Sequence, residues 1–177
     1  MNQKLYIITG APASGKLTIT KRVCNEKNKL FHNHLTVDLA LSLFPFGTKE
    51  YTNLCEKIRE FCIEAAFKNG IENLFFTFCY EGEVDIPFLN NLETISNRLN
   101  VSVKYVHIFV ERDVLMNRVS NNERFKFGKI TEAKKLESVL NSWKCEKPIP
   151  DRDSTIINNS NLSIDEAVEK LSQIIST

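Results

Sequence analysis

The stretch Gly10–Lys16 reads GAPASGK and lies between an apolar, β-prone run, Leu5–Thr9, and a helix-like segment at 16–27. Glycines at both ends of the stretch let the backbone bend sharply and approach a ligand closely. A loop that leaves a buried strand and opens a helix directs backbone N–H groups and the positive end of the helix at one place. Lys16 adds a mobile cation, so the stretch predicts a polyphosphate-binding loop.

The loop matches the first seven positions of the pattern GxxxxGK[ST] and departs from it at the eighth. Leu17 stands where the pattern has serine or threonine, and Thr18 follows it. We therefore expect Thr18 to face Mg²⁺, either directly or through a water molecule. The residues expected to hold the nucleotide phosphates are Gly10, Ala11, Pro12, Ala13, Ser14, Gly15, Lys16, Leu17 and Thr18.

Strand-like and helix-like segments alternate along the rest of the chain, which predicts βαβ units and a parallel sheet with helices on both faces. The stretch 74–79 is almost continuously apolar, as in a strand that is buried on both faces. Ser163–Glu166 is a capping box that opens the last helix. The expected strands are 5–9, 30–34, 74–79, 101–110 and 154–157, and the expected helices are 16–27, 37–44, 49–68, 85–99, 113–119, 131–143 and 163–175.

The composition is that of an ordinary globular domain, with 177 residues, 42% hydrophobic and 25% charged. This length suits one domain, 1–177, and the composition excludes a disordered chain and a membrane span. A net charge of +1 offers no large positive field to nucleic acid. The five cysteines form no CxxC pair and no export signal is visible, so we expect reduced thiols, a cytoplasmic location, and a monomer or homodimer without nucleic-acid or membrane partners.

Candidate acceptor residues follow the second expected strand, because ligands bind beyond the carboxyl ends of strands in such sheets. Asp38 is expected to orient a hydroxyl group or accept its proton, and His34 to contact the same substrate. The alternative for Asp38 is a carboxylate that only favours the helix dipole. His32 and His34 also leave a zinc site open, although no third ligand is identifiable.

Arg59 and Glu81 are two further substrate-binding candidates. Arg59 lies midway along a long helix and could clamp an anionic group, and Glu81 follows the third strand. The alternatives are a charge on the helix surface and a solvent loop. Between residues 30 and 100 the only other arginine is Arg98, whereas a phosphate-bearing acceptor needs several. We therefore expect a neutral or singly anionic acceptor that carries a hydroxyl group.

The order of elements, the phosphate loop with its GKxT spacing and the basic stretch 118–124 resemble the small P-loop kinases. This group includes shikimate kinase, gluconate kinase, the antibiotic phosphotransferases and the nucleoside monophosphate kinases. The resemblance implies an α/β, three-layer P-loop NTP hydrolase-type fold, with a five-stranded parallel sheet in the order 2-3-1-4-5 and a short lid at about 121–130. It also implies ATP as the phosphoryl donor and Mg²⁺ as the metal. The acceptor motifs of shikimate and gluconate kinase are not visible.

The resemblance also implies roles for residues after the fourth and fifth strands. Arg124 would be the lid arginine, Arg118 would stack on the adenine, and Asn159 would lie at the adenine edge. A basic lid suits phosphoryl transfer, which needs positive charge around the moving group and exclusion of water. The alternatives are a solvated basic surface for the lid and a polar turn for the loop that contains Asn159.

These features together predict an ATP-dependent phosphotransferase that acts on a hydroxyl group of a small molecule. Lys16 and Arg124 would stabilise the transferred phosphoryl group and Asp38 would orient the hydroxyl group. A nucleoside monophosphate kinase is one alternative, favoured by the GKxT spacing and disfavoured by the few acceptor-side arginines. An ATP-binding switch or sensor is the other, favoured because no strand ends in the aspartate of the usual second nucleotide-binding motif and disfavoured by the basic lid.

Overall fold

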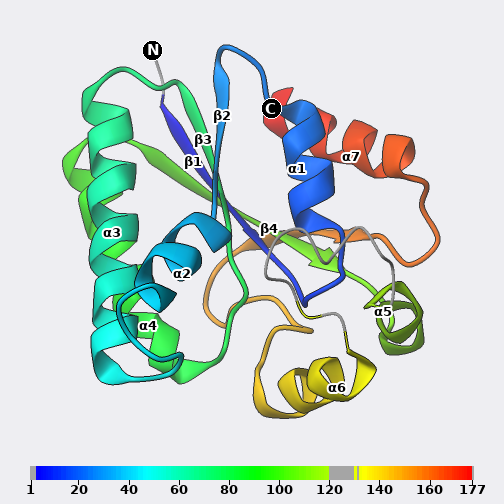
Figure 1. The fold of residues 1–177 in the computed structure, drawn as a ribbon. Helices are drawn as coiled ribbons and strands as arrows, with labels where there is room; N and C mark the ends of the chain where they lie inside the picture. Colours follow the sequence, from blue (N-terminus) through cyan, green and yellow to red (C-terminus); the bar gives the residue numbers. More distant parts are fainter. Residues whose placement is uncertain (1–2, 120–129, 131, 177) are drawn as a thin grey trace.

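The chain folds around one parallel sheet of five strands in the order β2-β3-β1-β4-β5 (Figure 1). The computed structural model describes residues 3–119, 130 and 132–176. The α/β class and the strand order predicted from the sequence are both confirmed. The strands are β1 (Lys4–Thr9), β2 (Asn28–His32), β3 (Asn73–Thr77), β4 (Ser102–Phe109) and β5 (Ser154–Asn158).

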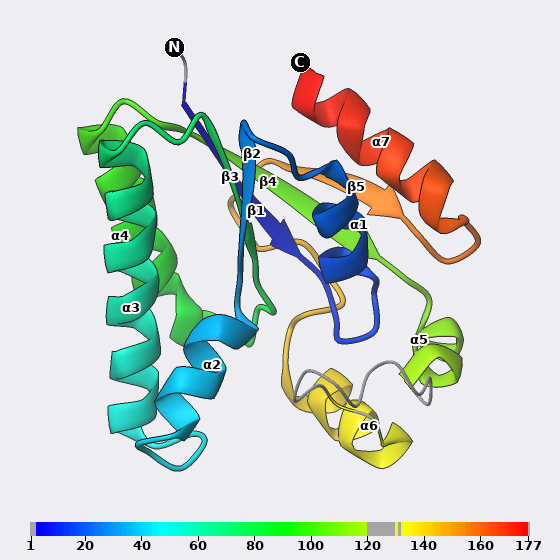
Figure 2. The same cartoon turned by 45° about the horizontal axis from the view of Figure 1, so that its top comes forward.

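Two pairs of helices cover the two faces of the sheet, with α3 and α4 on one face and α1 and α7 on the other (Figures 1 and 2). The helices are α1 (Lys16–Val23), α2 (His34–Leu41), α3 (Lys49–Lys68), α4 (Ile86–Arg98), α5 (Arg112–Val119), α6 (Ala133–Ser142) and α7 (Ile164–Ser176), with a short 3₁₀ turn, η1 (Glu83–Asp85). Within the described part of the chain, no helix is long and apolar enough to cross a membrane.

Side chains of β1 alternate between two apolar cores because successive residues of a strand point to opposite faces. Leu5 and Ile7 pack with residues of α3 and α4, while Tyr6 and Ile8 pack with residues of α1 and α7. β1 is central and both of its faces are covered, so its residues are almost entirely buried. This explains the continuous apolar run in the sequence.

Three helices, α2, α5 and α6, lie beyond the carboxyl ends of the strands rather than on a face of the sheet (Figures 1 and 2). The phosphate loop at 10–15 connects β1 to α1 at the same end. This end of a parallel sheet is where ligands bind in folds of this kind. The arrangement therefore places the loop, α2 and α6 around one region.

The second strand ends two residues before the predicted boundary, and α2 begins at His34 instead of at residue 37. β2 pairs only with β3, and the pairing stops at His32 opposite Thr77, where β3 itself ends. Asn33 then starts the helix, since its carbonyl accepts from the N–H groups of Thr36 and Val37. His34 is thus a helical residue, and the strand predicted through it was wrong at this position.

Phe75 is a suitable test of the core because its ring is fully buried and stacks on Tyr6 at 4.7 Å between centroids. We expect Phe75→Ala to lower the free energy of unfolding by about 3–5 kcal/mol, since it leaves a cavity between the sheet and the helices α1 and α7. Phe61→Ala is the matched control, because this side chain is 74% exposed on α3 and its removal should change stability by less than about 0.5 kcal/mol. Urea unfolding of both variants measures this, and equal effects would contradict the assigned core.

Candidate functional site

The phosphate loop lies directly against the neighbouring strand β4. Gly10 has φ 146°, and a Cβ at this position would lie 2.6 Å from the carbonyl oxygen of Ile108. Gly15 has φ 89° and forms the cap of α1. Ala13 has φ 70°, a left-handed conformation that is costly for a residue with a side chain and that occurs often at functional sites. The predicted loop conformation therefore depends on glycine at both ends.

Lys16 holds its ammonium group inside the curve of this loop. Its Nζ donates to the carbonyl oxygens of Gly10, at 2.9 Å, and Ala11, at 3.0 Å. The side chain thus lies beside the N-terminus of α1, where the helix dipole and the loop amides favour a bound anion. The buried hydroxyl of Ser14 has no hydrogen-bond partner among the described residues, and Ser14 also lines the adjoining cavity. This combination fits the phosphates of a nucleotide.

Asn159 and Arg118, both expected on the nucleotide side, lie together behind the phosphate loop. The Asn159 side-chain amide donates to the carbonyl of Ser14 at 2.8 Å, and its backbone N–H donates to Phe109. Arg118 donates to the carbonyl oxygens of Asn159, at 2.9 Å, and Ser160, at 3.3 Å. Burial lowers the pKa of Arg118. Neither Asn159 nor Arg118 lines the cavity of about 840 Å³ that opens beside the phosphate loop, so their expected contact with adenine stays a prediction.

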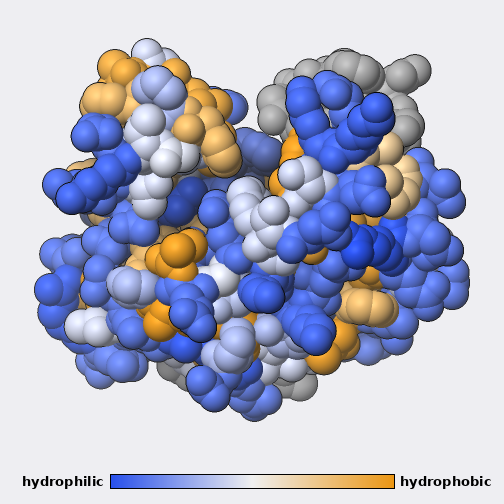
Figure 3. Space-filling view, turned by 90° about the horizontal axis from the view of Figure 1, so that it is seen from below, coloured by the Kyte–Doolittle hydropathy of each residue, from blue (hydrophilic) through white to orange (hydrophobic). Residues whose placement is uncertain are grey.

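A cavity of about 840 Å³ opens beside the phosphate loop. Its walls come from the loop, the start of α1, α2, α3, the segment after β3, and α6. From the carboxyl edge of the sheet, the surface is hollowed between two lobes, and apolar side chains gather on the lobe that lies on the side of α2–α4 (Figure 3). Exposed apolar residues of this lobe are Leu35, Leu39, Leu41, Leu43 and Phe46.

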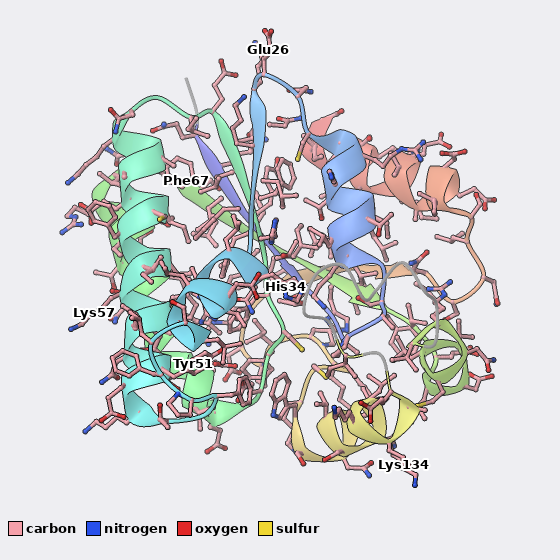
Figure 4. All side chains as sticks on the ribbon, viewed as in Figure 1. Glu26, His34, Tyr51, Lys57, Phe67 and Lys134 are labelled. Atoms are coloured by element: carbon pink, nitrogen blue, oxygen red, sulfur yellow. The ribbon has the colours of Figure 1, made fainter. Side chains whose placement is uncertain are left out.

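Three of the four predicted acceptor residues, His34, Arg59 and Glu81, line this cavity, and Asp38 does not. His34 lies near the centre of the molecule, where α2 begins, while Lys57 of α3 and Lys134 of α6 point outward (Figure 4). Asp38 lies on α2 among exposed residues, because the helix starts at His34 and turns Val37 rather than Asp38 toward the cavity. The structure therefore does not bring Asp38 to the place that its expected catalytic role requires.

Thr18 and Leu17 follow Lys16 on the cavity wall. Thr18 is exposed, and a threonine hydroxyl at this place fits an oxygen ligand for Mg²⁺. The zinc alternative at His32 and His34 finds no support, because no group of three or more possible metal ligands occurs among the described residues. Arg124, and the lid predicted at 121–130 with the exception of Ile130, lie outside the described residues.

Arg59 is buried, so the alternative of a surface charge on α3 was wrong. The side chain is 8% exposed, and its guanidinium carbon lies 5.6 Å from the ring of Phe78 and 5.4 Å from that of Phe88. Nε donates to the hydroxyl of Thr36 at 3.3 Å. Burial lowers the pKa of Arg59, but an arginine stays protonated in proteins. A fixed positive charge therefore lies in the wall of the cavity.

Glu56 and Asp85 also line the cavity and were not chosen from the sequence. The Asp85 carboxylate accepts a hydrogen bond from the backbone N–H of Glu81 at 2.6 Å. Burial, with a smaller contribution from Glu56, raises the pKa of Asp85 to about 6, while backbone hydrogen bonds and Arg59 oppose the shift. Burial also raises the pKa of Glu81 and that of Glu56. Glu56 could have been noticed because it precedes Arg59 by three residues and so shares its helix face.

Asp85 makes the stability of the protein depend on pH. Its carboxyl binds a proton more tightly in the native state than in the unfolded chain, so stability falls as pH rises from the ordinary value of 3.8 through about 6. Asp85→Asn cannot ionise, and we expect it to raise the free energy of unfolding by about 1–2 kcal/mol at pH 7.5 and much less at pH 4. Thermal and urea unfolding at both pH values measures this.

Glu83→Gln is the control for this variant, because Glu83 is exposed in the same turn and does not line the cavity. We expect it to leave the pH dependence of the parent chain unchanged. An Asp85→Asn variant that is less stable than the parent at pH 7.5 would show that the carboxylate is compensated in the native state.

The fold of this chain matches solved structures, two kinases among them, over nearly its whole length. No protein-family profile and no curated protein sequence matches the chain. A sugar kinase from a Janibacter species is 16% identical with a TM-score of 0.69, and covers 98% of this chain and 95% of its own. Shikimate kinase from Bacteroides thetaiotaomicron is 17% identical with a TM-score of 0.63, covering 98% and 99%.

A tunicamycin resistance protein from Deinococcus radiodurans has the same fold, with 12% identity, a TM-score of 0.61 and coverage of 98% of this chain and 96% of its own. At sequence identities this low, the matches establish similarity of fold and nothing further. The predicted resemblance is thereby confirmed at that level: the chain has a small P-loop kinase-like fold, a parallel α/β sheet with helices on both faces.

Proposed function

We propose that this protein transfers the γ-phosphoryl group of ATP, bound with Mg²⁺, to a hydroxyl group of a small molecule. The observation that carries the proposal is that one cavity has the phosphate loop at one end and charged acceptor-type side chains at the other. A phosphoryl donor and an acceptor must meet in line at a site from which water can be excluded. A protein that only stored or sensed a nucleotide would not need charged side chains at the acceptor end of the cavity.

Residues of the phosphate loop and α1 would hold the donor. The loop amides and Lys16 would bind the β- and γ-phosphates, and Thr18 would hold the metal ion directly or through water. Arg118 and Asn159 would support the nucleotide from behind the loop, since Asn159 donates a hydrogen bond to Ser14 of the loop and Arg118 donates one to the carbonyl of Asn159. Arg124 keeps its proposed role on the transferred group.

Glu81 is our candidate for orienting the acceptor hydroxyl group, in place of Asp38. Glu81 follows β3, which lies next to the central strand β1. It lines the cavity together with Cys79, which precedes it by two residues. Its carboxylate would accept the hydroxyl proton as the new P–O bond forms. His34 and Arg59 would then position the rest of the acceptor. A nucleoside monophosphate acceptor is disfavoured, because Arg59 is the only arginine among the described residues that line the cavity.

Lys16→Ala tests the donor half of the site. We expect it to lower acceptor-stimulated ADP release by at least about 100-fold, because the developing phosphoryl charge loses its cation. Lys21→Ala is the matched control on the same helix, since Lys21 is exposed and lies outside the cavity. Circular dichroism would check the fold. Full activity in Lys16→Ala would rule out the phosphate-loop assignment.

Glu81→Gln tests the acceptor half. We expect kcat to fall by about 100-fold while the KM for ATP stays within about twofold, because only the proton-accepting group is lost. Asp38→Asn is measured in parallel. If Asp38→Asn lowers kcat and Glu81→Gln does not, the role belongs to Asp38, as the sequence alone suggested.

A nucleotide-binding sensor is distinguished from a kinase by the response to acceptors. A kinase turns over when the acceptor is added, whereas a sensor binds ATP and shows the same low ADP release with every acceptor. ATP binding measured by calorimetry, together with ADP release across acceptors of different charge, separates the two.

A further inference from the structure

Arg59 lies in the wall of the acceptor half of the cavity, with donors that the described part of the chain does not use. The side chain is more than nine-tenths buried and forms no ion pair with any described residue. Its Nε donates to the hydroxyl of Thr36, while its terminal nitrogens donate to no described atom. A buried charge that lacks hydrogen-bond partners is costly. The remaining donors of this guanidinium therefore belong to whatever occupies the cavity.

The charge and the shape of this donor group suit a single carboxylate. A guanidinium presents parallel N–H groups that match the two oxygens of a carboxylate. Arg59 is the only arginine among the described residues that line the cavity. Apart from Lys16 of the phosphate loop, the lining lysines are Lys49 and Lys135, and both are exposed at the rim. One buried positive charge matches a carboxylate, whereas a phosphate monoester carries about two negative charges at neutral pH.

Three carboxyl groups, those of Glu56, Glu81 and Asp85, line the same cavity and would repel a bound anion if all were ionised. Among the described residues, none of them pairs with Arg59. Burial raises the pKa of each of the three, because a charged carboxylate is poorly solvated there. Their protonated forms are therefore more accessible than in water, and they oppose an anion less than three fixed charges would.

Apolar side chains continue from Arg59 to the mouth of the cavity along one face of α3. Cys55 and Tyr51 precede Arg59 by four and eight positions, which places them on the same helix face, and both are buried in the cavity wall. The ring of Phe46 lies 5.2 Å from that of Tyr51, and Phe46 lines the cavity although it is 62% exposed. A helix rises 1.5 Å per residue, so this wall extends about 12 Å from the buried charge. An apolar wall that begins at a cation suits a ligand with an anionic end and an apolar body.

We propose that the acceptor is a hydroxylated monocarboxylic acid with an apolar body, whose carboxylate binds Arg59 and whose apolar part lies against Tyr51 and Phe46. Its hydroxyl oxygen forms the new P–O bond as the γ-phosphoryl group leaves ADP, and the hydroxyl proton passes to Glu81. This inference rests on the proposed phosphotransferase function and names its substrate class. It narrows the neutral or singly anionic acceptor expected from the sequence, because Arg59 is buried, pairs with no described carboxylate and adjoins an apolar wall.

Acceptors that differ in one property at a time test the proposal. Mandelate has a carboxylate and an aromatic body, mandelamide has the same shape without the charge, and glycerate has the charge without the apolar body. Phenyllactate and its amide form a second pair. We expect at least one of the two aromatic acids to have a kcat/KM at least about tenfold above that of its amide and that of glycerate. Thermal shift with the same compounds measures binding without turnover, and this acid should raise the melting temperature most.

Arg59→Gln assigns the preference for the acid to the guanidinium. We expect kcat/KM for the acid to fall by about 100-fold, because a charged hydrogen-bond partner is lost, while kcat/KM for the amide and the KM for ATP stay within about threefold. The unchanged kinetics of the amide would also show that the variant is folded. Arg59→Lys keeps the charge without the planar fork and should give an intermediate loss. Lys57→Gln is the matched control, since Lys57 lies on the same helix and points outward (Figure 4).

Two further variants separate charge from apolar contact. Asp85→Asn removes a negative charge from the wall and keeps an oxygen for the N–H of Glu81, so we expect the KM for the acid to fall by about threefold. Phe46→Ser should raise the KM for the aromatic acid by about fivefold and leave that for glycerate unchanged. Phe61→Ser is its control, because Phe61 is exposed and lies outside the cavity.

Failure of the inference differs from failure of the proposed function. If neutral acceptors, amines or glycerate are turned over and the aromatic acids are not preferred, the phosphotransferase stands and the apolar acid is wrong. A preference for the acid that survives in both Arg59→Gln and Arg59→Lys would also overturn it. If ATP binds but no acceptor of any charge raises ADP release above that of Lys16→Ala, the proposed function fails together with the inference.

Discussion

The phosphate loop can lie against β4 only because glycine at position 10 permits a very close contact with that strand. A Cβ on Gly10 would lie 2.6 Å from the carbonyl of Ile108, which is closer than such atoms can pack. At its other end, the loop is held by Asn159, which donates to the carbonyl of Ser14. These contacts belong to β4 and the end of β5, so the loop is fixed by strands that come long after it in the chain. The direction of α1 and the position of Lys16 follow from the position of the loop.

The charged wall of the cavity depends in turn on the apolar core. Phe78 and Phe88 belong to the cluster that also contains Leu5 and Ile7, and the guanidinium of Arg59 lies against both rings. Aromatic faces attract a cation and exclude water from one side of it. The buried charge is thereby kept in one place, and Arg59 forms no ion pair with any residue that the structure describes. A change in the core under these rings would move the charge in the cavity.

Residues with strong local signals were predicted well. Gly10, Gly15 and Lys16 lie in the loop that their spacing predicted. The alternation of strands and helices predicted the parallel sheet, and the resemblance to small P-loop kinases predicted its strand order. Asp38 was chosen because it follows a strand, but the face that a short helix turns toward a cavity depends on what it packs against. Asp85 was not among the predicted site residues, although a 3₁₀ turn brings its carboxylate to the backbone N–H of Glu81.

The sequence by itself determined the fold class and the place of the phosphate loop, because hydrophobic periodicity and glycine conformations act over a few residues, whereas the strand order was predicted through the resemblance to small P-loop kinases. Only the tertiary structure decided which charges share the acceptor half of the cavity. Glu56 and Arg59 come from α3, while Glu81 and Asp85 follow β3 more than twenty positions later. They line the same cavity because α3 packs on the face of the sheet that contains β3. That packing depends on the whole core rather than on any one stretch of sequence.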